Sequence, residues 1–309
     1  MSKYLVFCLV MASLLVSCGK SDSTMVLPYD QKPFDSTDLF VKTFGSGEPI
    51  IVIHGGPLLD HSYFLPHFKE MEKDYQVILY DQRATGRNIA NADSSQMNLK
   101  AFAEDVERIR RSYGLSKINI LAHSWGALVA LKYAENYPLA INKLILSNPV
   151  PASAYDNGEL QLQLARQVTA YDSAKRKELM TGTLVREEPA KAIKELITLS
   201  LRRQLYDTAS MDQIDFYIPE DYMTRSQLYS HMYPDLQDYS FYGKMTELKS
   251  PTLILHGEAE LYSLPYSQKF ANDFINAKVV SIEKTGHFPF AEKPDRFFEV
   301  LRSFLKTSN

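Results

Sequence analysis

Cysteine is nearly absent from this chain of 309 residues: it occurs only as Cys8 and Cys18, both close to the N-terminus. The absence of cysteine beyond Cys18 excludes a disulfide scaffold, a thiolate metal site and a cysteine nucleophile from the folded part. Metal-ligand spacing is lacking among His61, His67, His231 and His256, and no glycine-rich loop has the form that cradles phosphate. We therefore expect no metal and no cofactor.

An excess of charge of one sign is also lacking. There are 34 Lys and Arg residues against 37 Asp and Glu residues, so the formal net charge is −3. A chain without a basic excess is not expected to bind nucleic acid. Beyond the N-terminus, no apolar run is long enough to span a membrane. The length suffices for one large α/β domain with an insertion or for two domains.

The N-terminus has the features of an export signal. Lys3 is followed by an apolar stretch at 4–16, which is too short for a spanning helix. The sequence LVSCG at 15–19 resembles a bacterial lipobox, in which cleavage leaves a lipidated cysteine as the first residue. We predict a signal peptide at 1–17, lipid attachment at Cys18 and a polar tether at 18–33. The predicted location is the cell envelope, anchored by lipid to a bacterial membrane at its periplasmic or cell-surface face.

Buried strands and helices are predicted to alternate over most of the chain. Apolar runs at 49–53, 76–80, 117–121, 143–147, 252–256 and 278–282 indicate buried strands, and an alternating edge strand at 39–44 precedes them. Helical patterns occur at 66–73, 99–113, 128–134, 267–275 and 295–305. This alternation indicates βαβ units and a mostly parallel sheet flanked by helices.

The alternation stops between residues 151 and 245. This stretch has helical patterns, clearest at 189–205, followed by a segment rich in Tyr and Met, and it contains no buried strand pattern. We interpret it as a helical cap inserted into an α/β core. The predicted division is a core at 34–150 and 246–309 and a cap at 151–245.

A candidate nucleophile lies where the strand at 117–121 meets the helix at 128–134. Ser124 stands there in the pattern Ala122-x-Ser124-x-Gly126. Such a junction is the nucleophile elbow, a sharp turn that lifts the hydroxyl above the sheet. Small residues two positions on either side are needed because the helix starts almost against the strand end.

A candidate base and acid follow two later strands. His287 comes after the strand at 278–282, and Glu260 comes after the strand at 252–256. Serine needs a base within hydrogen-bond reach, and a carboxylate orients that base. The order serine, acid, histidine is that of the α/β-hydrolase triad. Glu258, and more distantly Asp156, remain alternatives for the acid.

A glycine loop at the end of the strand at 49–53 supplies a candidate oxyanion hole. A backbone N–H in such a loop can turn towards the carbonyl oxygen under attack. We predict that the N–H groups of Gly56 and Trp125 form this hole. His54 and His123 are interpreted as scaffold residues.

Four motifs occur in a specific order: HGGP at 54–57, DQR-x-x-GR at 81–87, HSWG at 123–126 and GH at 286–287. Together they resemble the α/β-hydrolase superfamily, and specifically its proline iminopeptidase branch. The resemblance implies an α/β-hydrolase fold, a mostly parallel twisted sheet with a helical cap. It also implies Ser124 as nucleophile, His287 as base, Glu260 as acid, and oxyanion donors at Gly56 and Trp125.

The chain departs from the family pattern in several places. Leu58 and Ala84 stand where the family usually has glycine, and Glu260 stands where it usually has aspartate. The family's cap carries a tryptophan-rich signature and glutamates that hold the substrate's free amine, whereas this chain has a single tryptophan, Trp125. Candidate cap carboxylates are Glu187, Glu188, Asp215, Glu220 and Asp221.

These observations predict a serine hydrolase that acts through an acyl-enzyme on short peptides or amino-acid amides. A carboxylesterase-type hydrolase of small apolar acyl esters is the alternative, favoured by the Tyr- and Met-rich cap. A non-catalytic receptor that kept the fold and lost the reaction is a third possibility. The expected partners are a small-molecule or short-peptide substrate and, through Cys18, a membrane.

Overall fold

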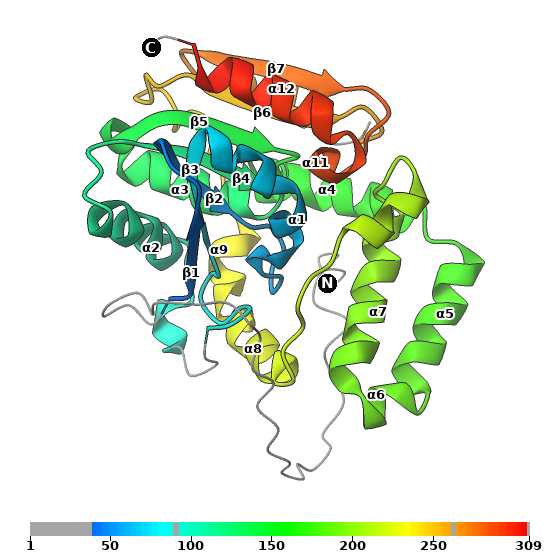
Figure 1. Ribbon diagram of the computed structural model, residues 1–309. Helices are drawn as coiled ribbons and strands as arrows, with labels where there is room; N and C mark the ends of the chain where they lie inside the picture. The colour runs from blue at the N-terminus through cyan, green and yellow to red at the C-terminus, as the bar shows by residue number, and fades with distance from the viewer. Residues whose placement is uncertain (1–38, 89–92, 261–263, 308–309) are drawn as a thin grey trace.

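The computed structural model describes residues 39–88, 93–260 and 264–307 (Figure 1). The predicted signal peptide, the lipid attachment site at Cys18 and the tether all lie outside the described residues. Within the described part, no helix combines the length and the apolar character that crossing a membrane requires.

A single sheet of seven strands forms the centre of the described chain, with the strand order β1-β3-β2-β4-β5-β6-β7. Strand β1 pairs antiparallel with β3, and every other pair is parallel. The predicted edge strand and the mostly parallel α/β sheet are thus confirmed. The strands are β1 (Val41–Phe44), β2 (Glu48–Ile53), β3 (Tyr75–Tyr80), β4 (Ile118–His123), β5 (Ile141–Ser147), β6 (Thr252–Gly257) and β7 (Ala277–Ile282).

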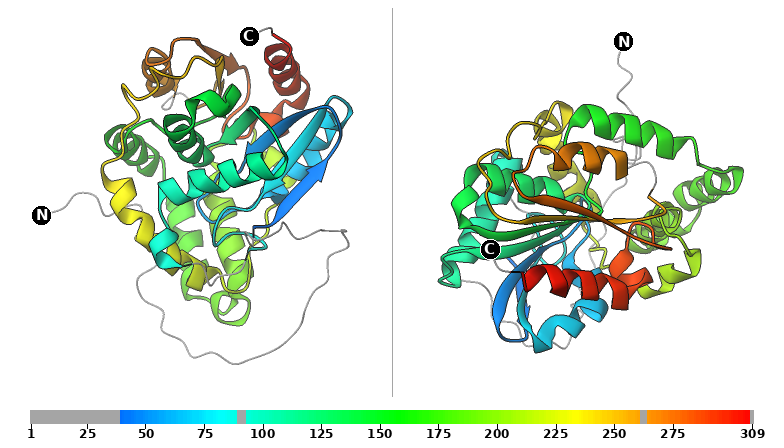
Figure 2. Two further views of the ribbon diagram at one scale, coloured as in Figure 1. Left: turned by 90° about the vertical axis from the view of Figure 1, so that its left-hand side faces the viewer. Right: turned by 90° about the horizontal axis from the view of Figure 1, so that it is seen from above.

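Helices cover both faces of this sheet (Figure 2). One face carries α2 (Leu99–Ser112), α3 (Gly126–Asn136) and α10 (Leu264–Ala271); the other carries α1 (Leu65–Phe68), α11 (Pro289–Glu292) and α12 (Pro294–Leu305). Helix α2 shows why the sequence folds this way. The Asn98 side chain caps its first turn by accepting from the Ala101 N–H at 2.9 Å, and its apolar face buries Phe102, Val106 and Ile109.

The helix predicted at 66–73 is only partly correct. The α-helical part is the short α1, which 3₁₀ turns at His61–Phe64 and Lys69–Lys73 flank. Phe64, Phe68 and Met71 are fully buried, and a 3₁₀ turn aligns residues three apart on one face. The 3₁₀ turn that ends this segment therefore places Met71 on the same buried face as Phe68. Phe68 then packs against Phe298 of α12 at a ring distance of 5.4 Å.

Residues 151–245, which we call the cap, are helical and join β5 to β6. The helices are α4 (Ala154–Ala165), α5 (Ala170–Thr181), α6 (Leu184–Glu187), α7 (Pro189–Arg202), α8 (Tyr222–Tyr229) and α9 (Tyr233–Gln237). Helices α5, α6 and α7 project away from the sheet (Figure 1). The two ends of the cap are pinned together: the Ala154 N–H donates to Tyr239 and the Phe241 N–H to Ala152, each at 2.8 Å.

The motif at 81–87 contributes to the attachment of the cap to the core. In the cap, the Tyr217 N–H donates to the Asp60 carboxylate at 3.2 Å, and Arg87 pairs with the same carboxylate at 3.3 Å. The buried guanidinium of Arg225 on α8 donates to the Gly86 carbonyl at 3.1 Å and pairs with Asp221 at 2.6 Å. These contacts hold α8 and the segment before it against the loop that follows β3.

Candidate active site

The carboxyl ends of β4, β6 and β7 lie at the same edge of the sheet because these strands are parallel. Ser124 follows β4, Glu260 follows β6 and His287 follows β7. The Ser124 Oγ atom lies 2.9 Å from His287 Nε2, and His287 Nδ1 is hydrogen-bonded to Glu260 Oε1. The structure thus brings the predicted nucleophile, base and acid into one hydrogen-bonded line.

The predicted elbow is visible in the backbone of Ser124. Its φ of +54° lies in the left-handed region, which costs a non-glycine residue about 1 kcal/mol. Gly126 explains how the turn can be so tight, since a Cβ atom there would lie 2.6 Å from the carbonyl oxygen of His54. Helix α3 therefore starts directly against the end of β2, and Ala122 is buried in β4 without any exposed surface.

Glu260 is held from a second side as well. Its Oε2 atom accepts from the Asn148 amide at 2.5 Å and lies 3.3 Å from His256 Nδ1. Burial alone would raise the pKa of Glu260, but the charge on His287 and the hydrogen bonds of both histidines outweigh burial and hold the pKa well below its ordinary value. The carboxylate is therefore ionised at neutral pH.

Asn148 was not among the predicted site residues. It follows β5 directly, and its amide donates also to the Gly286 carbonyl at 3.1 Å. It thereby joins the acid to residues 286–288, which we call the base loop. Its position at the carboxyl end of a parallel strand was the signal that could have identified it.

The two alternative acids lie elsewhere. The exposed Glu258 carboxylate accepts from the Lys284 N–H at 3.1 Å. Asp156 lies on α4, where it accepts from the Tyr242 hydroxyl at 2.6 Å and pairs with Lys269 at 3.2 Å. Glu260 is the carboxylate that the structure joins to His287.

His123 is buried and supports the base through its backbone. Its Nε2–H donates to the His287 carbonyl at 2.8 Å, so its Nδ1 accepts from the Tyr63 hydroxyl at 2.9 Å. The Tyr63 oxygen in turn accepts from the Gly55 N–H at 2.6 Å. Burial, aided by the charge of His287, lowers the pKa of His123 to about 3. This neutral imidazole thus connects the glycine loop to the base loop, a more specific role than the predicted scaffold.

His54 and Gln82 connect the glycine loop to the elbow. His54 Nδ1 donates to the Gly55 carbonyl at 2.7 Å, and its Nε2 accepts from the Gln82 N–H at 3.0 Å. Burial lowers the pKa of His54 to about 4, which keeps this ring neutral. The Gln82 side chain accepts from the Trp125 indole N–H at 3.2 Å, so the Asp-Gln-Arg motif also orients the residue after Ser124.

The predicted oxyanion donors have free N–H groups. The Gly55 N–H is used by Tyr63, whereas the Gly56 N–H has no hydrogen-bond partner among the described residues. Trp125 is the N-cap of α3, so its N–H has no acceptor within the helix, and the helix dipole favours negative charge there. Both groups remain predictions as oxyanion donors.

The departures at Leu58 and Ala84 have a backbone consequence. Leu58 has a φ of +69° and Ala84 a φ of +55°, both in the left-handed region that glycine adopts without strain. A glycine at these two positions matches this backbone. The Leu58 and Ala84 side chains are buried. Holding each of these two residues in the left-handed backbone region costs about 1 kcal/mol.

The candidate cap carboxylates lie on the surface. Glu187, Glu188, Asp215 and Glu220 are exposed, and Asp221 is half-buried. Three of the five pair with cap cations: Glu188 with Lys191 at 3.3 Å, Asp215 with Lys194 at 2.5 Å and Asp221 with Arg225 at 2.6 Å. Glu187 and Glu220 form no ion pair with another described residue, so they remain the candidates with unpaired charge.

Asp60, His61 and Asp81 form a buried group whose ligand atoms lie within 4.8 Å of one another. The Asp81 carboxylate already accepts from His61 Nδ1 at 2.6 Å and from the Arg87 N–H at 2.8 Å. Burial and the charge of Asp81 raise the pKa of Asp60 to about 6. The existing hydrogen bonds give this group a structural task, the attachment of the cap.

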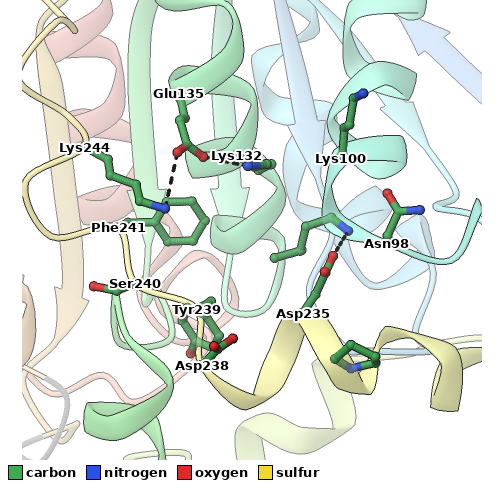
Figure 3. Close-up of a pocket in the computed structure, with 12 residues that line it drawn as sticks. Asn98, Lys100, Lys132, Glu135, Asp235, Asp238, Tyr239, Ser240, Phe241 and Lys244 are labelled. Carbon is green, nitrogen blue, oxygen red and sulfur yellow. Dashed lines mark hydrogen bonds and ion pairs between the residues drawn. The ribbon is translucent and has the colours of Figure 1, made fainter.

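A groove of about 370 Å³ lies between α2, α3 and the end of the cap (Figure 3). Its charged side chains are mostly paired: Glu135 binds Lys132 at 2.8 Å and Lys244 at 3.3 Å, and Asp235 accepts from the Leu99 N–H at 2.6 Å. None of the triad residues lines it. The groove therefore marks a junction of cap and core that is separate from Ser124.

Comparisons with known proteins identify the family of the fold. A family model described as the alpha/beta hydrolase fold matches residues 48–294. The proline iminopeptidase of Heyndrickxia coagulans is 26% identical over 272 residues, which cover 85% of this chain and 92% of that protein.

Solved structures share the fold. The proline iminopeptidase of Mycobacterium smegmatis has a TM-score of 0.66 at 22% identity, covering 89% of this chain and 97% of its own. A thermophilic esterase from Thermogutta terrifontis has a TM-score of 0.64 at 20% identity, covering 90% and 97%. The family match extends over most of the sequence, and the chain therefore belongs to the alpha/beta hydrolase fold family and is a hydrolase.

Proposed function

We propose that this hydrolase works through a Ser-His-Glu triad, with Ser124 as nucleophile, His287 as general base and Glu260 as the orienting acid. The observation that carries the proposal is the hydrogen-bonded line from Ser124 Oγ through both nitrogens of His287 to Glu260. A serine on a strained elbow with a base at 2.9 Å is a nucleophile prepared for attack.

In the proposed reaction, His287 Nε2 removes the Ser124 proton as Oγ attacks the substrate carbonyl carbon. The Gly56 and Trp125 N–H groups stabilise the developing oxyanion. The imidazolium of His287 then protonates the leaving amine or alcohol, and the acyl group stays on Ser124. Water, deprotonated by His287, releases the acid and restores the serine. Glu260 remains ionised throughout, because its role is to hold the Nδ1–H tautomer and stabilise the imidazolium.

The proposed substrates are short peptides or amino-acid amides, cleaved at the N-terminus. The support is the similarity to proline iminopeptidases at about a quarter of positions over most of both chains. A carboxylesterase-type hydrolysis of small apolar acyl esters is the second candidate. Two of the candidate cap carboxylates, Glu188 and Asp215, are exposed and already pair with lysine, which favours this second candidate.

Two measurements test these proposals. A fluorophosphonate should label the folded protein stoichiometrically at Ser124, and no labelling would overturn the enzymatic role in favour of a receptor. Rates are then compared on prolyl and alanyl arylamides, the same arylamides with a blocked amine, and short acyl esters. A requirement for the free amine identifies an aminopeptidase, and indifference to the amine identifies an esterase or amidase.

We also propose that the mature chain begins at Cys18 and is lipid-anchored to a bacterial membrane in the cell envelope. The support is the apolar stretch at 4–16 followed by LVSCG at 15–19. Metabolic labelling with a fatty acid should mark the wild-type protein and leave Cys18→Ser unmarked. Equal labelling of both would contradict the anchor.

A further inference from the structure

The loop that carries His287 is bound by the cap as well as by the core. The His287 N–H donates to the carbonyl oxygen of Gln204 at 2.8 Å, and Gln204 lies just after α7 in the cap. A Cβ atom on Gly286 would lie 2.1 Å from the same carbonyl oxygen. The cap and the loop of the base therefore meet through their main chains, with no side chain between them.

Glu292, the last residue of α11, binds both partners of this contact. Its Oε1 atom accepts from the Gly286 N–H at 2.8 Å and from the Phe288 N–H at 3.4 Å. Its Oε2 atom accepts from the Tyr206 N–H at 2.7 Å. One carboxylate thus joins the residues on either side of His287 to the cap segment 204–206. Charge-assisted hydrogen bonds of this kind are stronger than neutral ones.

The two sides of the base loop have different partners. Its carbonyl groups face the core, since Asn148 donates to the Gly286 carbonyl and His123 donates to the His287 carbonyl. Its N–H groups face Glu292 and the cap. The core partners stand at strand ends, whereas the cap segment 204–206 follows the C-terminal end of α7. That end of α7 is the one nearest the sheet (Figure 1).

We propose that Glu292 is a positioning residue that couples the cap to the catalytic base. The inference rests on the proposed function of Ser124 and His287, and it adds a regulatory contact to that function. An occupant of the site that orders the cap segment 204–206 also orders the loop of His287, because the same carboxylate holds both. Without the carboxylate, the His287 N–H still donates to the Gln204 carbonyl, but the bonds that join Gly286 and Phe288 to the Tyr206 N–H through Glu292 are lost.

The first test is the rate at which a small fluorophosphonate labels Ser124, measured per folded molecule in Glu292→Gln. A glutamine amide offers one acceptor oxygen, so the Gly286 or the Tyr206 N–H loses its partner. We expect labelling to slow at least about tenfold. Glu258→Gln is the matched control: Glu258 also accepts a backbone N–H near this loop, from Lys284, but it is exposed and does not bind the cap. It should label within about twofold of the wild type.

The second test follows amide hydrogen exchange in peptides that cover 203–208 and 284–289. In the wild type, a phosphonyl adduct on Ser124 should slow exchange in both peptides. In Glu292→Gln, the adduct should slow exchange in 284–289 and leave 203–208 unchanged. A residue that only stabilised the fold would change neither the rate per folded molecule nor this pattern.

Labelling of Glu292→Gln at the wild-type rate, or equal protection of 203–208 in both proteins, would overturn the coupling. If the wild type is not labelled at all, the proposed function fails. The contact is then tested by exchange without a probe, where the Gly286 and Tyr206 amides should exchange faster in the variant and unchanged rates would overturn it. If Glu292→Gln does not fold, Glu292→Asp keeps the charge on a shorter arm. Ser124 in Glu292→Asp should be labelled more slowly than in the wild type. Labelling at the wild-type rate while the protection of 203–208 is lost would refute the inference.

Discussion

Glu260 in the core and Asp215 in the cap have opposite surroundings. Glu260 in the core is only 13% exposed and is bound by two histidines and an amide, whereas Asp215 in the cap is 80% exposed and pairs with a surface lysine. Surface pairs of this kind contribute little, typically up to about 1 kcal/mol. A buried carboxylate, by contrast, must be fully partnered to stay ionised. The carboxylate beside His287 therefore lies in a fully partnered site, whereas the surface around Asp215 offers only a single lysine.

The largest effect should come from removing the nucleophile. Ser124→Ala is expected to lower kcat by at least about 10⁴-fold, because no other group supplies the attacking atom. Circular dichroism and the thermal midpoint should stay close to those of the wild type. A kcat within tenfold of the wild-type value would show that Ser124 is not the nucleophile.

The next largest effect tests the acid. Glu260→Gln retains the shape and removes the charge that fixes the His287 tautomer, so kcat should fall about 10³- to 10⁴-fold. Glu258→Gln is the control from the same loop and should leave kcat unchanged. A nearly silent Glu260→Gln would mean that another carboxylate serves the base.

A weaker effect is expected where core and cap meet. Arg225→Met removes the buried guanidinium that holds α8 to the loop after β3, and should lower the free energy of unfolding by about 2 kcal/mol. KM should rise more than kcat falls, since fewer molecules have the cap in place to bind. The exposed Arg202→Met is the matched control on α7. An unchanged KM in Arg225→Met would show that the cap is held by its other contacts.

The buried neutral histidines of the core predict a dependence of stability on pH. His123 has a pKa of about 3 in the folded protein against 6.5 when unfolded. As pH falls from 6.5 towards 3, the unfolded state gains a proton that the folded state does not, so stability decreases. Each such histidine contributes a slope of up to about 1.4 kcal/mol per pH unit.

Urea unfolding between pH 4 and 6.5 measures this slope. His123→Gln should show a shallower slope than the wild type, and an equal slope would contradict a neutral His123. The pKa of Asp60 is raised to about 6, so protonation of Asp60 increases stability as pH falls, opposite to the effect of His123. Because Asp60 is present in both proteins, the difference between their slopes reports on His123.

The smallest effect should come from the cap carboxylates. Glu188→Gln and Asp215→Asn remove exposed charges that already pair with lysine, so kcat/KM on an amino-acid arylamide should change less than about twofold. A loss above tenfold in either variant would show that this carboxylate binds the substrate's amine, and the contrast between core and cap would then fail.

The core could be predicted from sequence because its signals are local. Continuous apolar runs identify buried parallel strands, and parallel strands place the residues after them at one edge of the sheet. Ser124, Glu260 and His287 could therefore be chosen before their distances were known. Glu258 could not be separated from Glu260 in this way, because two residues of loop carry no periodic signal that says which side chain turns inward.

Contacts between distant parts of the chain had no local sequence signal. Glu292 acts on backbone N–H groups in the cap, and a bond between residues 86 positions apart leaves no trace in spacing or composition. The left-handed backbone at Leu58 and Ala84 was hidden for a related reason: the residues present there do not favour it. The cap is hardest to predict because helical periodicity shows which face is buried and says nothing about which substrate lies beneath it.

The order of the strands has a consequence for when the proposed triad can form. Strands β1 to β5 are five contiguous strands of the seven-stranded sheet, and the chain up to β5 already carries Ser124. Strands β6 and β7 join the edge of the sheet only after the whole cap has been made. Acid and base thus arrive with the last part of the chain to be synthesised. A nascent chain, or one truncated before residue 246, would carry an elbow serine with nothing to activate it. If the proposed triad is correct, hydrolytic activity therefore requires the final part of the chain to be in place.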